Sequence, residues 1–222
     1  MRRITLALAL VVLAAAPATA SSAATLVSPT GGRLVGTFPL LEWTLPTGER
    51  NEVVYIASKP ARADTGEFVT ENLEDTAPMS GRAGSHRTTN GLYAGRHSWL
   101  VGTRNADFEQ RFSKVGRFKV APSLSVTRTR VTSGSTAGSA DFRLRLKTNA
   151  RTLQITIQVS QGGRVVQTFA RTAPVLNPGV WGSRKVHWTP SSAVASSRAA
   201  TLRATIRAGS RIAHATVNVT AP

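Results

Sequence analysis

Residues 142–159 read FRLRLKTNARTLQITIQV and contain two runs in which apolar and polar side chains alternate. In the first run, phenylalanine and leucine alternate with arginine and lysine; in the second, leucine, isoleucine and valine alternate with threonine and glutamine. Successive side chains of a β-strand point to opposite faces of the sheet, so this period of two is typical of a strand with one buried face. Both runs are therefore predicted to be strands of an antiparallel sheet that packs one face on a core.

The same rhythm continues outward along the chain. Gln161-Gly162-Gly163 predicts a turn, residues 202–207 alternate again, and a second turn at 208–210 leads into the apolar positions of 212–219. Helical periodicity is missing from residues 21–222. Short strands spaced by roughly 8–12 residues favour sandwiches of about 100 residues each. The predicted fold class is all-β, with two tandem antiparallel β-sandwich domains.

The boundary between the two domains is predicted from charge. Residues 21–120 hold twelve basic and ten acidic residues, whereas 121–222 hold fourteen basic residues and the single acid Asp141. This step coincides with Val120–Ser123, where Pro122 interrupts sequence that otherwise predicts strands. We therefore expect domains at 21–120 and 121–222.

The first twenty residues, MRRITLALALVVLAAAPATA, have the layout of a secretory signal peptide. Two arginines precede an apolar run, and Ala18-Thr19-Ala20 forms a small-x-small cleavage site. Residues 1–20 are predicted to be removed before Ser21, which gives a secreted, extracellular or cell-wall associated protein. An uncleaved N-terminal anchor is the alternative.

Three stretches of the first half carry a family resemblance: FPLLEWTLP at 38–46, LYAGRHSWLVGTRN at 92–105 and FSKVGRFKV at 112–120. Their order and spacing resemble the fibronectin type III domains of secreted bacterial proteins, over roughly residues 25–120. The second half resembles an immunoglobulin-like sandwich by its strand rhythm alone.

The resemblance implies places for particular side chains of the first half. Trp43 would lie in the core on the second strand, and Val115 and Phe118 would belong to the closing strand. The remaining inward positions, all on the sixth strand, would be His97, Trp99 and Val101. The chain departs from the family at Ala94, where proline is usual, and near His97, where tyrosine is usual.

Basic side chains of the second half occupy the polar positions of its predicted strands, opposite the apolar faces. They would form an exposed face able to bind an anionic polymer such as a cell-wall polyanion, an acidic polysaccharide or DNA. A merely solvated face is the alternative. The candidate polyanion-binding residues are Arg128, Arg130, Arg143, Arg145, Lys147, Arg203, Arg207 and Arg211.

Trp181 is a candidate exposed aromatic contact, because the surrounding Asn177–Gly182 has turn chemistry that predicts a loop. Such a ring could stack on a sugar or on a partner's side chain. The alternative is a loop tryptophan that folds over the end of the sandwich.

The sequence favours no catalytic chemistry. Cysteine is absent, which excludes disulfides, thiolate metal sites and thiol nucleophiles. The four histidines lack metal-ligand spacing, and we expect no catalytic, cofactor-binding or metal-binding residues and no cofactor. The acidic cluster of Glu71, Glu74 and Asp75 leaves one enzymatic alternative, a weak or accessory cell-wall glycoside hydrolase.

The function expected from these observations is that of a non-catalytic secreted binding or spacer protein of the bacterial envelope or extracellular space. An electrostatic anchor to an anionic polymer through the second domain is the alternative within the same class. The partner would be a protein or an anionic polymer. After signal cleavage, we expect no integral membrane segment in this chain.

Overall fold

The computed structural model describes residues 23–133 and 139–221. The predicted signal peptide at 1–20 lies outside the described residues, as does the side chain of Arg128. In the described part of the chain, no helix is both long and apolar enough to cross a membrane. Apart from one short 3-10 turn, η1 (Thr70–Asn72), the described secondary structure consists of β-strands, which confirms the predicted all-β fold class.

The first half contains two sheets. The smaller sheet has the strand order β1-β3-β6, and the larger has the order β2-β9-β7-β4-β5 with β8 paired to β7. All of these ladders are antiparallel except that between β2 and β9. The strands are β1 (Thr25–Ser28), β2 (Arg33–Val35), β3 (Leu40–Thr44), β4 (Arg50–Ala57), β5 (Leu73–Pro78), β6 (Ser85–Arg87), β7 (Gly95–Arg104), β8 (Gln110–Phe112) and β9 (Gly116–Val120).

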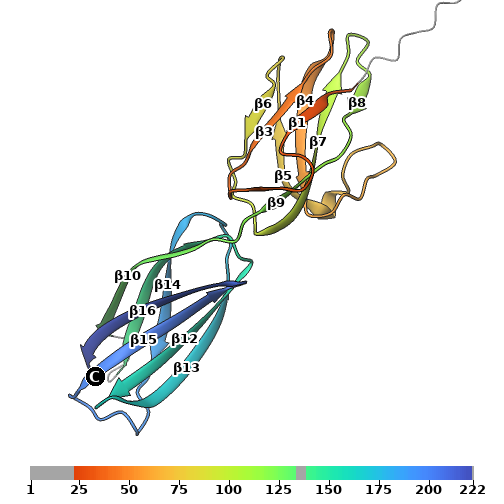
Figure 1. Ribbon diagram of the computed structural model, residues 1–222. Coiled ribbons are helices and arrows are strands. Elements are labelled where there is room, and N and C mark those ends of the chain that lie inside the picture. Colours follow the sequence, from red (N-terminus) through yellow and green to blue (C-terminus); the bar gives the residue numbers. More distant parts are fainter. Residues whose placement is uncertain (1–22, 134–138, 222) are drawn as a thin grey trace, which may run out of the picture.

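The second half also contains two sheets, of order β10-β11-β14 and β13-β12-β15-β16, and every ladder is antiparallel. No ladder between described strands joins this half to the first, and Figure 1 shows the two halves end to end. The strands are β10 (Leu124–Ser133), β11 (Ala140–Thr148), β12 (Thr152–Gln161), β13 (Arg164–Pro174), β14 (Trp181–Trp188), β15 (Ala199–Ala208) and β16 (Arg211–Thr220).

The two halves share one topology. When β2 and β8 are set aside, each half has seven strands, of which the first, second and fifth form one sheet. The other four follow the order fourth, third, sixth, seventh in both halves. Each half is thus a sandwich of three strands against four. The two halves share this topology although their sequences show no visible repeat.

The cores lie between the sheets, where the alternation places the apolar faces. In the second half, Phe142 and Leu144 of β11 and Ile155 and Ile157 of β12 are at most 1% exposed and belong to one cluster. The turn between β12 and β13 is Gly162-Gly163, and both residues have positive φ, which suits a two-residue hairpin.

The core of the first half agrees with the family resemblance at most positions. Trp43 on β3 is buried, and its ring meets the edge of Trp99 at a centroid distance of 6.3 Å. His97 and Val101 on β7 and Phe118 on β9 are buried too. Val115 is the exception. It lies just before β9 and packs in a separate apolar cluster with Phe68 and Leu100. This cluster lies on the outer face of the larger sheet, where the loop after β4 carries Phe68 over it.

The junction between the sandwiches is organised by Asn149, which is fully buried. Its side-chain oxygen accepts a hydrogen bond from the backbone of Ser123 at 2.8 Å. Its amide donates to the carbonyl of Ala121 at 2.8 Å and to the hydroxyl of Thr37 at 3.2 Å. One side chain therefore joins the linker, the first half and the second.

Close backbone packing, a hydrogen bond and a cation–π contact reinforce this junction. A Cβ at Gly91 would overlap the carbonyl oxygen of Pro178, so only glycine fits there. The hydroxyl of Tyr93 donates to the carbonyl of Val175 at 2.7 Å, and the guanidinium of Arg151 lies over the Tyr93 ring, 4.6 Å from its centroid.

Candidate functional site

The outer surface of the sheet β10-β11-β14 carries cations in direct register. Arg130 on β10 is opposite Arg143 on β11, and Arg143 is opposite Lys185 on β14. All three are exposed. Phe142 and Leu144, which flank Arg143 along β11, turn inward to the core, so Arg143 points outward. Three positive side chains thus form a row across the sheet.

Further rows on this surface add cations and an aromatic ring. Arg145 is opposite Ser183, and Lys147 is opposite Trp181. The Arg145 guanidinium lies 5.9 Å from the centroid of the Trp181 ring, which is within the range of a cation–π contact. Below, "the basic face" means the surface formed by Arg130, Arg143, Arg145, Lys147, Lys185 and Trp181.

Like charges directly opposite one another in a sheet are unfavourable, and one buried carboxylate relieves part of this repulsion. Asp141 Oδ1 accepts from His187 Nδ1 at 3.1 Å, and Oδ2 lies 3.3 Å from Lys185 Nζ and 3.8 Å from Arg143 Nη2. The hydrogen bond from His187, followed by that from Lys185, holds the pKa of Asp141 below its usual value. Since Asp141 is the only acid of residues 121–222, the basic face keeps a strong positive excess.

A cleft of about 670 Å³ runs along this surface. It is lined by Arg130, Arg143, Arg145 and Lys185 together with the hydroxyls of threonine and serine side chains. A hollow lined by several cations and hydroxyl donors suits phosphate, sulfate or carboxylate groups.

Trp181 lies on a strand and not in a loop, which corrects the sequence-based interpretation. The turn chemistry ends at Val180, and Trp181 is the first residue of β14. It remains 38% exposed. Pairing with β11 brings Trp181 to the basic face, so two candidates that the sequence left separate belong to one surface.

The predicted arginines do not form a single face. Arg203 and Arg207 are exposed on β15, which belongs to the opposite sheet β13-β12-β15-β16. Arg211 donates from Nε to the carbonyl of Pro122 at 3.1 Å, so it ties the start of β16 to the linker. These corrections arise because alternation shows that a side chain is exposed but not which sheet carries it.

Sequence reasoning missed Lys185, Asp141 and His187 as members of this surface. Their alternation was visible, since Lys185 and His187 flank Val186, which is buried. What the sequence did not show is the register that sets Lys185 against Arg143 and His187 against Asp141.

The acidic cluster is engaged in structural contacts. Glu74 lies 2.8 Å from His97 Nδ1 and 2.5 Å from Arg151 Nη2. Burial alone would raise the pKa of Glu74, but His97 and Arg151 outweigh it and leave that pKa lowered. Asp75 accepts from the Asn90 amide at 3.2 Å, and Glu71 is exposed on η1. None of the three carboxylates lines the cleft on the basic face. None lines a second cavity, which lies in the first half beside β7 and β9.

Within residues 23–133 and 139–221, no group of three or more histidine, aspartate or glutamate side chains is placed to hold a metal ion.

No protein-family model matches the chain, and no curated protein matches it. Among solved structures, it is similar to a tetra-tandem repeat in the extending region of a large adhesion protein, at 18% identity and a TM-score of 0.44 over 89% of this chain. The chain spans about half of that one, 48%.

Two further similar structures contain fibronectin type III modules. The Clostridium thermocellum CbhA fibronectin(III)-like modules match at 12% identity and a TM-score of 0.29, over 89% of this chain and 93% of theirs. Chicken CNTN1 domains FN1–FN3 match at 11% identity and a TM-score of 0.31, over 90% of this chain and 68% of theirs.

Proposed function

We propose that the chain is a non-catalytic, exported binding protein that attaches to an anionic polymer through the basic face. The observation that carries this proposal is the row of Arg130, Arg143 and Lys185 in direct register, with a single carboxylate to balance it. Such an arrangement costs stability in the free protein. A bound polyanion would offset that cost by placing negative charge between the cations.

The attraction would be mainly electrostatic. A protein that neutralises charges on a polyanion releases its condensed counterions, so binding weakens steeply as salt rises. Arginine suits this role because its planar guanidinium can meet a phosphate or carboxylate with two parallel hydrogen bonds. Trp181, which contacts Arg145 and remains partly exposed, adds a flat apolar surface for a sugar ring or a base.

The rest of the molecule would serve as a spacer. The two sandwiches share one topology and meet at the buried Asn149, so the first half would be held at a defined distance from the bound polymer. We assign them to domains at 21–120 and 121–222. Residues 1–20 would direct the chain out of the cell, where anionic polymers of the envelope are accessible.

Titration of the full mature chain against heparin, teichoic acid and duplex DNA, at about 50 and about 200 mM salt, tests the proposal. For the duplex, log K should fall linearly with log[salt], with a slope near −0.9 for each neutralised phosphate. The double variant Arg143→Ala/Arg145→Ala should flatten that slope by nearly two units, since it removes two of the contacting cations.

The matched control is Arg164→Ala/Arg198→Ala, which removes two exposed arginines outside the basic face. It changes net charge by the same amount and should leave the slope close to that of the parent protein. Equal losses in both double variants would assign the affinity to net charge alone. No binding of the parent protein to any of the three polymers at low salt would overturn the proposal.

A further inference from the structure

The first half contains a larger cavity, of about 1320 Å³, beside β7 and β9. Its cationic lining consists of Arg96, Lys114, Arg117 and Lys119, all four exposed at the surface. No aspartate or glutamate lines it. In the described part of the chain, no carboxylate forms an ion pair with any of these four residues.

This gathering of charge is unexpected from the composition. Residues 21–120 are nearly balanced, with ten acids against twelve bases. Three of the acids pair elsewhere: Glu52 with Arg104, Glu109 with Arg111, and Glu74 with His97. The overall balance therefore hides a local excess of positive charge at the cavity.

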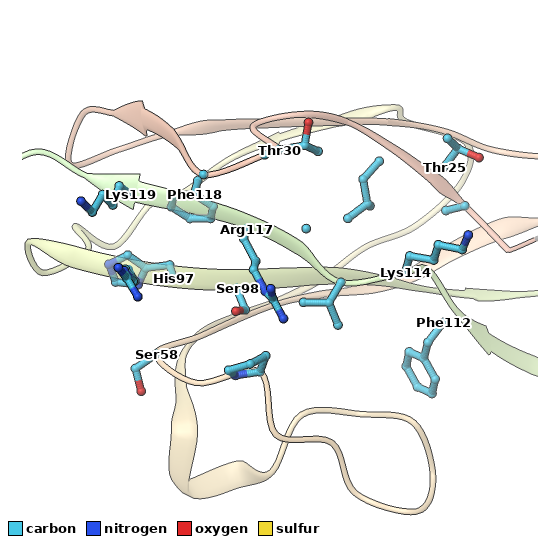
Figure 2. Close-up of a pocket in the computed structure, with 18 of the residues that line it drawn as sticks. Thr25, Thr30, Ser58, His97, Ser98, Phe112, Lys114, Arg117, Phe118 and Lys119 are labelled. Carbon is cyan, nitrogen blue, oxygen red and sulfur yellow. The ribbon is translucent and has the colours of Figure 1, made fainter.

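The strand register concentrates this excess. Arg96 on β7 is directly opposite Lys119 on β9, and Ser98 is directly opposite Arg117. The two cations of the first pair repel each other across the ladder, which is unfavourable in the free protein. Figure 2 shows Ser98 and Arg117 on the side of the sheet that faces the loop carrying Ser58, and all three residues line the cavity.

The cavity also has an apolar part. Phe112 and Val115 line it next to Lys114, and both pack on the apolar cluster of the outer face. Pro60 and Leu26 line it as well. Binding sites for small molecules commonly combine such an apolar wall with a few convergent polar groups.

We propose that this cavity is a second ligand site, for an organic anion that carries a phosphate, sulfate or carboxylate next to a ring or alkyl portion. The anionic group binds Arg117 beside Ser98, and the apolar portion covers Val115 and Phe112. The site is separate from the basic face, so it does not depend on the function proposed above.

Phenyl phosphate is a suitable probe, with inorganic phosphate as its charged half and benzyl alcohol as an uncharged aromatic comparison. Titrations followed by amide NMR on the full mature chain should shift residues 96–98 and 114–119. Phenyl phosphate should bind several-fold more tightly than inorganic phosphate, and benzyl alcohol should bind most weakly. Arg117→Gln should weaken phenyl phosphate binding by roughly tenfold or more, as expected when a charge-assisted hydrogen bond is lost.

The matched control is Arg50→Gln, an exposed arginine of the same half that does not line the cavity. It should change affinity by less than about twofold, because a surface charge away from the site acts only through screened solvent. Arg143→Ala/Arg145→Ala should retain phenyl phosphate binding, which separates this site from the basic face. Shifts confined to other residues, or equal losses in Arg117→Gln and Arg50→Gln, would overturn the proposal.

Discussion

Asp141 is the residue on which the electrostatics of the second half depend. Its carboxylate is buried and contacts His187, Lys185 and Arg143, while the surrounding surface carries only positive charge. These contacts favour the ionised carboxylate, so its pKa in the folded protein is lower than in the unfolded chain. A single acid thus makes a dense group of cations tolerable.

The lowered pKa of Asp141 predicts a specific dependence of stability on pH. A carboxyl group with a depressed folded pKa contributes stability above its unfolded pKa, here 3.8, and this contribution is lost as the pH falls through the folded pKa. Asp141→Asn should remove that part of the acid dependence. Urea denaturation of the parent protein and the variant between neutral pH and about pH 2 measures the difference.

If Asp141→Asn follows the parent profile at low pH, the ion contacts of Asp141 contribute nothing to folding.

At the scale of elements, β11 shows how one strand serves both the core and the site. Phe142, Leu144 and Leu146 turn to the core cluster, while Arg143 and Arg145 are exposed on the basic face. The alternation along β11 therefore buries the apolar side chains that stabilise the fold and places the cations together on the opposite face. A slip of one residue in register would exchange the two faces.

Two neighbouring substitutions on β11 test this division. Leu144→Ala should destabilise the protein by about 2–5 kcal/mol, since a buried leucine leaves a cavity. Arg143→Ala should change stability by no more than about 0.5 kcal/mol, as is usual for an exposed side chain. Chemical denaturation of both variants gives the comparison, and similar small effects would mean that Leu144 does not belong to the core.

At the scale of the whole molecule, the junction determines how the two sandwiches act together. Asn149 is buried between the linker and both halves, and the pair of Glu74 and Arg151 links β5 to the segment before β12. The two ligand surfaces proposed above lie in different halves, so a rigid junction would hold them at a fixed separation.

Asn149→Ala should loosen this junction. The substitution leaves the backbone groups of Ala121 and Ser123 without their side-chain partner, which costs roughly 1–3 kcal/mol for each buried group left unpaired. Small-angle X-ray scattering should then show a broader distribution of distances than in the parent protein, together with a lower melting temperature.

Asn218→Ala is the matched control, because the Asn218 side-chain oxygen accepts an exposed hydrogen bond from the Thr201 hydroxyl on the sheet β13-β12-β15-β16, away from the junction. Its scattering profile should equal that of the parent protein. An unchanged profile for Asn149→Ala would show that close packing at Gly91 and Gly179 suffices to hold the junction.

The sequence alone determined the strands and the orientation of most side chains. Alternation is a local property, because neighbouring residues of a strand must point to opposite faces. It correctly predicted the buried positions of β11, β12 and β15, the glycine turn between β12 and β13, and the exposure of Arg143 and Arg145. The quoted stretches of the first half similarly identified Trp43 and Trp99 as core residues.

Only the tertiary structure decided which exposed residues share a surface. The row of Arg130, Arg143 and Lys185 depends on pairing between strands that are distant in sequence, as does the contact of Arg145 with Trp181. The same pairing separates Arg203 and Arg207 from this row and gathers Arg96, Arg117 and Lys119 at the cavity of the first half. The physical reason is that strand register and sheet membership are set by long-range packing of the apolar faces, which a local pattern does not encode.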